Sequence, residues 1–368
     1  MNTEAGRAEA GKIDWSSVDR VLVIKLRSIG DTVLATPSLI ALRHHLPSAR
    51  IDILLEKWVA PLLDGFEVVD EVLTVGNTFT ERLSSLREIR RRRYDVVLNL
   101  HGGTTATLLS GLSKARHRVG FSNYQYSFLF NNRVSSPVDF WGRSAVHSAE
   151  QQLALLGSVG VPVRHTPRSR LHISESALGF VRSRLSSAGI IKPFVLLHPT
   201  TAFFTKQWPV RSFARTAEFI ESIGLSVVAV GSNAEKQLLE ELKKLSAVRI
   251  RTFPDMSLPQ ITALASEASL FVGNDSGIAH IAAAVNTPSV VIFGSSNRDH
   301  WRPWTHAPNE IVFTELHCQP CPGYVCKEYG DSRCVRDLPV AAVIDAIKRV
   351  LAKEKAGPGP PRIKTKET

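Results

Sequence analysis

The sequence predicts an α/β protein built from two doubly wound units in tandem. Short apolar, β-rich runs alternate with amphipathic segments along the chain, which is the pattern of a parallel sheet covered by helices. Some of these runs are apolar almost throughout, as residues 21–26 are, and this is typical of strands covered on both faces. Polar turns follow the runs. Two such units are expected to face each other across a cleft, with ligands beyond the carboxyl ends of the strands.

The first unit is expected to begin with a strand at 21–26, a turn at 27–31 and a helix at 32–46 that ends before Pro47. Further strands are predicted at 51–55, 71–75 and 95–100, with helices near 58–63 and 80–93. A turn at 101–105 leads into another helix, and a helix at 146–159 closes the unit. A basic stretch with prolines at 160–170 indicates the boundary. We therefore expect an extension at 1–19 and a first domain at 20–168.

The second unit repeats the alternation over residues 169–351. Strands are predicted at 194–197, 225–230, 271–274 and 288–293. Helices are predicted at 209–223, where Pro209 suits a first turn, at 233–245, from Ser257 onward, and at 339–351. Residues 352–368 are rich in Lys, Pro and Gly and are expected to be a disordered tail.

Composition narrows the class of protein. The apolar runs of this 368-residue chain are far too short to span a membrane, and its polar start lacks the features of a secretory signal, so we expect a cytoplasmic protein. A formal net charge of +11 favours nucleic acid, anionic lipid or phosphorylated substrates as partners. The arginines at 82–93 are not interleaved with aromatics, which argues against nucleic acid. A solvated helix face is the simpler interpretation of that run.

The turn between residues 273 and 277 organises the second unit. An apolar run ends at Gly273-Asn274-Asp275-Ser276-Gly277 and is followed by a helix of small residues. The glycines would let backbone amides approach a ligand, and the helix start could hold a phosphate. Asp275 would repel that phosphate unless it caps the helix or faces a hydroxyl or a cation. An ordinary capped turn is the alternative interpretation.

Three other polar residues follow strands, and each has a functional and a structural interpretation. Asp31 would lie at a helix start, ionised and able to accept a proton, or it could be a simple cap. Lys206 could neutralise a departing diphosphate, or it could be a surface lysine. Glu235 could bind the two hydroxyls of a ribose, or it could be a first-turn glutamate. The turn before Asp31 lacks Gly-x-Gly-x-x-Gly, so it is no dinucleotide site.

Three motifs occur in an order that is more specific than any one of them. They are Ile24-Lys25-Leu26-Arg27-Ser28-Ile29-Gly30-Asp31 with its continuation to Pro37, His198-Pro199 through Lys206-Gln207-Trp208-Pro209, and Gly273 through His280. Over about residues 21–350 the sequence resembles the lipopolysaccharide heptosyltransferases of glycosyltransferase family 9. The resemblance implies a GT-B architecture, with the acceptor on the first domain and the nucleotide sugar on the second. It also implies an inverting, metal-independent transfer.

The resemblance assigns roles to single residues. It makes Asp31 the general base and Lys206 a catalytic ligand of the donor diphosphate. The expected donor-binding residues are Thr200, Thr201, Lys206, Glu235, Asp275, Ser276, Gly277 and His280. The expected acceptor-binding residues are Arg27, Ser28, Gly30, Arg116 and Arg118.

The implied partners are ADP-heptose, the inner core of lipopolysaccharide and the anionic cytoplasmic face of the inner membrane, and not nucleic acid. Two alternatives stay open at this point. One is a GT-B transferase with another nucleotide sugar or glycan acceptor, and the other is a basic, non-catalytic binding protein.

All four cysteines lie in residues 317–334, spaced Cys318-x2-Cys321-x4-Cys326-x7-Cys334. Such clusters are rarely disulfide-bonded in cytoplasmic proteins, and four thiolates could hold a structural zinc ion. Unligated or variably paired thiols are the alternative. No cofactor is expected to be required for catalysis. A similar cysteine-rich tail in family members named as the third heptosyltransferase favours that subgroup.

Overall fold

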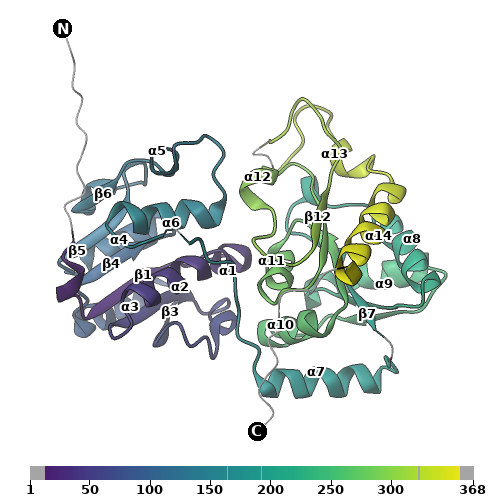
Figure 1. Cartoon of the computed structure of the whole chain (residues 1–368), viewed down its shortest axis with the longest axis horizontal. Helices are drawn as coiled ribbons and strands as arrows, with labels where there is room; N and C mark the ends of the chain where they lie inside the picture. Colours follow the sequence, from purple (N-terminus) through teal and green to yellow (C-terminus); the bar gives the residue numbers. More distant parts are fainter. Residues whose placement is uncertain (1–12, 164, 192, 322–323, 357–368) are drawn as a thin grey trace. The chain divides into compact units, whose positions relative to one another are not determined.

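The computed structural model describes residues 13–163, 165–191, 193–321 and 324–356 (Figure 1). It divides into two compact units, Met1–His172 and Ile173–Thr368. None of the helices in the described part of the chain has the length and apolar character that crossing a bilayer requires.

The first unit is built on a six-stranded parallel sheet in the order β3-β2-β1-β4-β5-β6. Its strands are β1 (Arg20–Ile24), β2 (Arg50–Glu56), β3 (Glu71–Val75), β4 (Val96–Asn99), β5 (His117–Phe121) and β6 (Asn132–Val134). The chain order reverses beside β1, which pairs with both β2 and β4. Sheets of this kind bind ligands at such a switch point.

Helices cover both faces of this sheet. They are α1 (Ile29–Val33), α2 (Thr36–His45), α3 (Phe79–Arg92), α4 (Thr104–Leu112), α5 (Pro137–Trp141) and α6 (Ser148–Ser158), with 3₁₀ turns η1 (Trp15–Ser17), η2 (Ala60–Leu63) and η3 (Ser127–Leu129). One continuous core joins α3 and α4 to the sheet, and its members include Leu22, Ile24, Leu86 and Leu109. Helix α6 packs against both α2 and α5.

The second unit repeats this plan with the order β12-β11-β10-β7-β8-β9. Its strands are β7 (Phe194–His198), β8 (Ser226–Val230), β9 (Ile250–Phe253), β10 (Leu270–Asn274), β11 (Ser289–Ile292) and β12 (Asn309–Val312). All are parallel. The switch point lies between β7 and β10, the first and fourth strands of this unit.

Two helical layers cover the second sheet (Figure 1). Helices α8 (Val210–Ser222), α9 (Lys236–Leu245) and α14 (Val340–Ala356) share a core with Val195, Leu197 and the fully buried Trp208. Helix α10 (Leu258–Glu267) packs against both α7 (Glu175–Ser187) and α11 (Gly277–Ala284). The short elements are η4 (Phe204–Lys206), η5 (Asn233–Glu235), α12 (Arg298–Trp301) and α13 (Arg333–Arg336).

The structure corrects several predicted elements. The single helix expected at 32–46 is two helices, α1 and α2, and it begins three residues earlier, so Asp31 lies inside the first turn. Residues 58–63 form only a 3₁₀ turn, η2. Strands β5, β6, β9 and β12 and helix α7 were not predicted. Helix α14 continues to Ala356, into the expected tail, whose residues 357–368 lie outside the described part, as do residues 1–12 of the expected extension.

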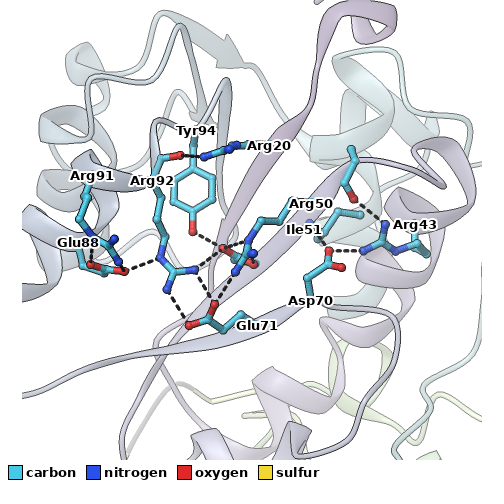
Figure 2. Close-up of polar contacts among 12 residues, drawn as sticks. Arg20, Arg43, Arg50, Ile51, Asp70, Glu71, Glu88, Arg91, Arg92 and Tyr94 are labelled. Carbon is cyan, nitrogen blue, oxygen red and sulfur yellow. Dashed lines mark hydrogen bonds and ion pairs between the residues drawn. The ribbon is translucent and has the colours of Figure 1, made fainter.

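The arginine-rich helix α3 is tied to the amino edge of the first sheet (Figure 2). Arg92 donates to Glu71, Glu88 and the fully buried Asp52, while Arg91 also donates to Glu88. The Tyr94 hydroxyl donates to Asp52 as well. A buried carboxylate needs such partners, because an unpaired charge in the interior is costly. Arg92 therefore ties α3 to the sheet edge, while Arg91 pairs with Glu88 on its own helix.

Candidate active site

Asp31 lies in the first turn of α1, just beyond the carboxyl end of β1. Its Oδ1 atom is 2.9 Å from the Lys25 ammonium, and its Oδ2 atom accepts a 3.0 Å hydrogen bond from the Ser28 hydroxyl. Burial alone would raise the pKa of the Asp31 carboxyl, but Lys25 and then Ser28 outweigh it and hold that pKa below its usual 3.8. The carboxylate is thus ionised at neutral pH and can accept a proton.

Lys25, which directly follows β1, holds the Asp31 carboxylate in place. Its side chain is almost fully buried, and its ammonium also donates to the Leu100 carbonyl oxygen at 3.1 Å. A buried lysine requires a carboxylate and a further acceptor to offset its lost hydration. The pair therefore fixes the position of Asp31 relative to both β1 and the end of β4.

The loops after β4 and β5 each bring one more titratable side chain, His101 and Tyr124, within electrostatic reach of Asp31. Burial lowers the pKa of His101, and Lys25 lowers it further against the opposing effect of Asp31. Burial and the nearby Asp31 charge raise the pKa of Tyr124. Asn99 builds the loop after β4, because its side-chain oxygen accepts from the backbone amides of His101 and Gly102. Gly102 has a positive φ of 80°, and a Cβ there would lie 2.6 Å from the Tyr124 ring.

The structure gathers only some of the expected acceptor-binding residues. Ser28 contacts Asp31, Gly30 is buried within α1, and Arg27 is exposed in the preceding loop. Arg116 and Arg118, by contrast, lie at the amino end of β5, whereas Asp31 follows the carboxyl end of the parallel strand β1. Arg118 donates to the carbonyl oxygens of Leu129 and Ala115. These two arginines do not belong to the Asp31 cluster, because sequence spacing cannot tell which end of a strand a residue occupies.

In the second unit, the turn after β10 is built by Asn274. Its side-chain oxygen accepts from the Trp208 backbone amide at 3.1 Å, and its side-chain nitrogen donates to the Pro199 carbonyl oxygen at 3.0 Å. Gly273 is required for packing, since a Cβ there would lie 2.9 Å from the His198 carbonyl oxygen. Close packing against β7 therefore accounts for the glycine at this position.

Asp275 and Lys206 form an ion pair beside this turn. The Lys206 ammonium lies 2.8 Å from Asp275 Oδ2, the same oxygen that accepts from the Ser296 hydroxyl. The ammonium also lies over the Phe203 ring, 5.4 Å from its centroid. The negative charge of Asp275 in this turn is thus balanced by the Lys206 ammonium. The pair leaves Lys206 as the more exposed partner and Asp275 as the buried one.

Two other expected donor-binding residues, Thr200 and Ser276, are linked through a buried histidine. His198 Nε2 lies 3.1 Å from the Thr200 hydroxyl oxygen, and Nδ1 lies 3.0 Å from the Ser276 hydroxyl oxygen. Thr200 also lowers the pKa of the Glu235 carboxyl. Burial lowers the pKa of His198 to about 4, so the ring is neutral at physiological pH. His198 begins one of the three sequence motifs, but no role was assigned to it from the sequence.

Glu235 is more engaged than its expected ribose-binding role requires. Its Oε2 atom accepts from both the backbone amide and the hydroxyl of Ser232, at 2.7 Å each, which forms a capping box. Burial would raise the pKa of Glu235, but the bonds from Ser232 and Thr200 lower it below its usual value. Of the remaining expected donor residues, Thr201 is half-buried, Gly277 starts α11, and His280 is buried within that helix.

The cysteine loop lies in the second unit and shows no metal geometry. Cys318, Cys321, Cys326 and Cys334 line one small pocket with Thr205 and Ser295. All four are unpaired thiols, and burial first, then the neighbouring thiols, raises the pKa of Cys334 to about 11. Over residues 13–163, 165–191, 193–321 and 324–356, no three His, Cys, Asp or Glu side chains are grouped to hold a metal ion. The expected zinc site is therefore not supported.

The model of glycosyltransferase family 9 (heptosyltransferase) matches residues 82–330, more than half of the chain. Lipopolysaccharide heptosyltransferase 3 of Escherichia coli is 27% identical over 355 residues, which cover 90% of this chain and 99% of that protein.

Two solved structures share the fold. E. coli ADP-heptose lps heptosyltransferase II has a TM-score of 0.77 at 22% identity and covers 92% of this chain and 100% of its own. E. coli heptosyltransferase WaaC, solved with ADP-2-deoxy-2-fluoro heptose, has a TM-score of 0.66 at 17% identity and covers 90% and 99%. The two-domain GT-B class that the sequence predicts is thereby confirmed.

Proposed function

We propose, from the premise that the chain belongs to glycosyltransferase family 9, that this enzyme transfers heptose from ADP-heptose to the inner core of lipopolysaccharide. It is a glycosyltransferase, and its relatives named above act on lipopolysaccharide. The observation that carries the proposal is Asp31, an ionised and partly exposed carboxylate held in place beyond the switch-point strand of the first unit. A transferase needs such a proton acceptor next to the hydroxyl of its acceptor substrate.

Asp31 is the proposed general base. It accepts the proton of an acceptor hydroxyl while that oxygen forms a bond to the anomeric carbon of the donor. The bond from the anomeric carbon to the diphosphate oxygen breaks in the same displacement, and ADP leaves with that electron pair. Because the attack comes from the opposite face of the sugar, the configuration at the anomeric carbon inverts. Lys25 and Ser28 hold the Asp31 carboxylate in position and keep it ionised.

The second unit supplies the proposed donor site. Lys206 is a cation held beside Asp275, and on donor binding it would stabilise the negative charge that develops on the leaving ADP. Backbone amides at the start of α11, near Ser276 and Gly277, would add to that stabilisation. This pairing of a lysine with helix amides can do what a divalent cation does in other glycosyltransferases, so we propose a reaction without a required metal.

We also propose that the enzyme works at the anionic cytoplasmic face of the inner membrane, where a lipid-borne acceptor would be found. The first unit exposes Leu108 and Leu112 on α4 and, next to it, Phe128 in η3. Lys114 and Arg116 are exposed between α4 and β5, and the sequence has no Asp or Glu from 96 to 138. Apolar side chains flanked by exposed cations favour binding to an anionic bilayer.

The donor is tested by thermal unfolding. ADP-heptose is expected to raise the unfolding midpoint of the protein and UDP-sugars are not, because only a ligand of the folded state stabilises it. Stabilisation by a UDP-sugar instead would indicate another donor. Mass spectrometry of lipopolysaccharide from a deletion strain then tests the acceptor, since loss of one heptose is expected.

The membrane surface is tested by co-sedimentation with phosphatidylglycerol vesicles. The double variant Phe128→Ser and Lys114→Gln is expected to bind the vesicles less than the parent. The matched control, Phe180→Ser and Lys244→Gln in the second unit, changes residues of the same types and is expected to bind like the parent. Equal binding by all three proteins would contradict this surface.

A further inference from the structure

Two loops at the carboxyl edge of the second sheet pack against each other next to the Lys206–Asp275 ion pair. One follows β7 and contains η4, which holds Thr205 and Lys206, and the other, residues 293–297, follows β11. Gly294 allows their close approach, because a Cβ at this position would lie 2.3 Å from the Thr205 carbonyl oxygen and 3.2 Å from the Lys206 Cα atom. The backbones of the two loops are therefore in direct contact.

A buried hydrogen bond between side chains joins these two loops. The Ser295 hydroxyl donates to the Thr205 hydroxyl oxygen at 2.9 Å, and the Ser295 backbone amide donates to the Thr205 carbonyl oxygen at 3.3 Å. The two residues are only 3% and 2% exposed. A buried hydroxyl that loses its partner is costly, because water cannot replace that partner. The bond therefore holds the two loops at one separation.

The residues that follow Thr205 and Ser295 in the chain both contact one carboxylate oxygen. Lys206 and Ser296 each donate to Asp275 Oδ2. The Asp275 residue is itself buried, and its backbone amide donates to the carbonyl oxygen of the last residue of β11 at 2.9 Å. These contacts close a ring that passes through both loops and returns to the carboxylate. The Lys206 backbone cannot shift without straining a buried bond of this ring.

The cysteine loop, residues 317–334, bonds to both loops of the ring. The Cys321 backbone amide donates to the Ser295 carbonyl oxygen at 2.9 Å. On the other loop, the Ser332 hydroxyl donates to the Phe204 carbonyl oxygen at 3.3 Å, and α13 packs against η4. The cysteine loop thus supports the backbone on both sides of the bond between the two hydroxyls.

We propose that Thr205 and Ser295 are positioning residues, and that their hydrogen bond fixes the Lys206 ammonium where the donor's diphosphate binds. This inference rests on the proposed function, because it concerns the same donor site. A cation that is already in place stabilises the charge on a leaving group without a cost of reorganisation during the reaction. The two hydroxyls act through Lys206 and not by contact with the donor, because both are buried and bonded to each other. The alternative is a bond that contributes to stability alone.

Two variants remove this bond, one from each side. Thr205→Val keeps the shape of the side chain and loses the hydroxyl, and Ser295→Ala loses the other partner. Each is expected to lower kcat/KM for ADP-heptose about tenfold and to weaken ADP binding about as much, because the ammonium is held less firmly. Thr205→Ser keeps a hydroxyl and is expected to behave like the parent. Kinetics and isothermal titration calorimetry measure the two effects, and Ser295→Ala decides the question if Thr205→Val folds poorly.

Thr287→Val is the matched control in the same unit. Thr287 is 3% exposed, and its hydroxyl donates to the Ala265 carbonyl oxygen at 2.6 Å. It therefore also joins two elements through a buried hydroxyl, but it precedes β11 and lies at the amino end of the sheet. This variant is expected to lower the unfolding midpoint and to bind ADP and transfer heptose like the parent.

Combination with Lys206→Met separates positioning from stability. If the bond acts through Lys206, Thr205→Val is expected to leave the ADP affinity of Lys206→Met unchanged, because the ammonium that the bond would position is gone. In the parent the same change is expected to cost about tenfold in ADP affinity. A bond that only stabilises the fold would lower the unfolding midpoint in both backgrounds and leave ADP binding as it was.

Different outcomes overturn different statements. If the parent neither binds ADP nor transfers heptose, the proposed function fails, and this inference with it. If the parent does both and Lys206→Met weakens ADP binding, but Thr205→Val and Ser295→Ala behave like the parent, the proposed function stands and the positioning role is wrong. An equal loss from Thr205→Val in the parent and in Lys206→Met would overturn that role as well, because the bond would then act on something other than the ammonium.

Discussion

Each unit carries one lysine–aspartate pair at the carboxyl edge of its sheet, and the two pairs are exposed in opposite ways. In the first unit, the Lys25 side chain is 6% exposed and that of Asp31 30%. In the second, the Lys206 side chain is 20% exposed and that of Asp275 5%. The N–O separations are nearly the same, 2.9 and 2.8 Å. The same ion pair thus offers a carboxylate in one unit and an ammonium in the other, as a proton acceptor and a diphosphate ligand require.

The largest effect is expected when the exposed carboxylate loses its charge. Asp31→Asn keeps the shape of the side chain but cannot accept a proton, so the rate of transfer is expected to fall by about 10²- to 10⁴-fold. The affinity for ADP should stay that of the parent, because ADP is assigned to the second unit. Steady-state kinetics and calorimetry measure the two quantities. Transfer at the parent rate would show that Asp31 is not the base, and the carboxylate of the first unit would then have no counterpart role to the ammonium of the second.

Removal of the exposed ammonium is expected to have the next largest effect. Lys206→Met should lower kcat/KM roughly 10²-fold, because a preorganised cation no longer stabilises the leaving diphosphate. ADP binding should weaken as well, unlike in Asp31→Asn. Lys244→Met, an exposed lysine on α9, is the control and should transfer like the parent. If Lys206→Met weakens neither ADP binding nor transfer, the ammonium is only a structural partner of Asp275.

Replacement of the buried lysine tests how the pair sets the pKa of the base. Lys25 lowers the pKa of Asp31 against burial, so in Lys25→Met that pKa should rise, and the acidic limb of the pH–rate profile should move to higher pH. Because the folded-state pKa of Asp31 is depressed in the parent, Asp31 contributes stability above its unfolded pKa, and this is lost as pH falls through the folded pKa. Denaturation at several pH values should show a smaller acid dependence in Lys25→Met. An unmoved acidic limb would show that Lys25 does not set the pKa of the base.

The smallest effect is expected from the ion-pair network at the amino edge of the first sheet. Tyr94→Phe removes one hydrogen bond to buried Asp52 and should lower the free energy of unfolding by about 1–3 kcal/mol. It should leave kcat and KM unchanged, because this edge is remote from the carboxyl ends of the strands. Urea denaturation and kinetics check both. A change in KM would mean that the amino edge also takes part in binding.

Much of the fold was predictable because it depends on local patterns. Strand β3 was predicted with the bounds it has, and the alternation of strands and helices indicated two units. Strands β5, β6, β9 and β12 were missed because each carries polar residues or is short, and their place depends on neighbours that no window of sequence contains. The break between α1 and α2 was missed because nothing in the apolar spacing marks it.

The site was predictable where a residue follows a strand and stands out by its charge. Asp31, Lys206 and Asp275 do so, and their roles stay proposals, but the structure shows two of them to be an ion pair. Lys25 was read as part of the strand predicted at 21–26, and His198 was named only as the start of a motif, so neither was assigned a role. A lysine or histidine at the end of an otherwise apolar strand is the signal that could have revealed both, since its burial demands partners. Arg116 and Arg118 were chosen for their charge, which does not tell one end of a sheet from the other.

The four thiols that line the cysteine pocket should differ in how fast they are alkylated. Three of its thiols are half-accessible, while Cys334 lies beneath them with its pKa raised to about 11. A thiolate-selective alkylating reagent should therefore modify Cys318, Cys321 and Cys326 first. The rate at which Cys334 is modified would then measure how often α13 and its surroundings open. This part of the second unit therefore reports on local unfolding.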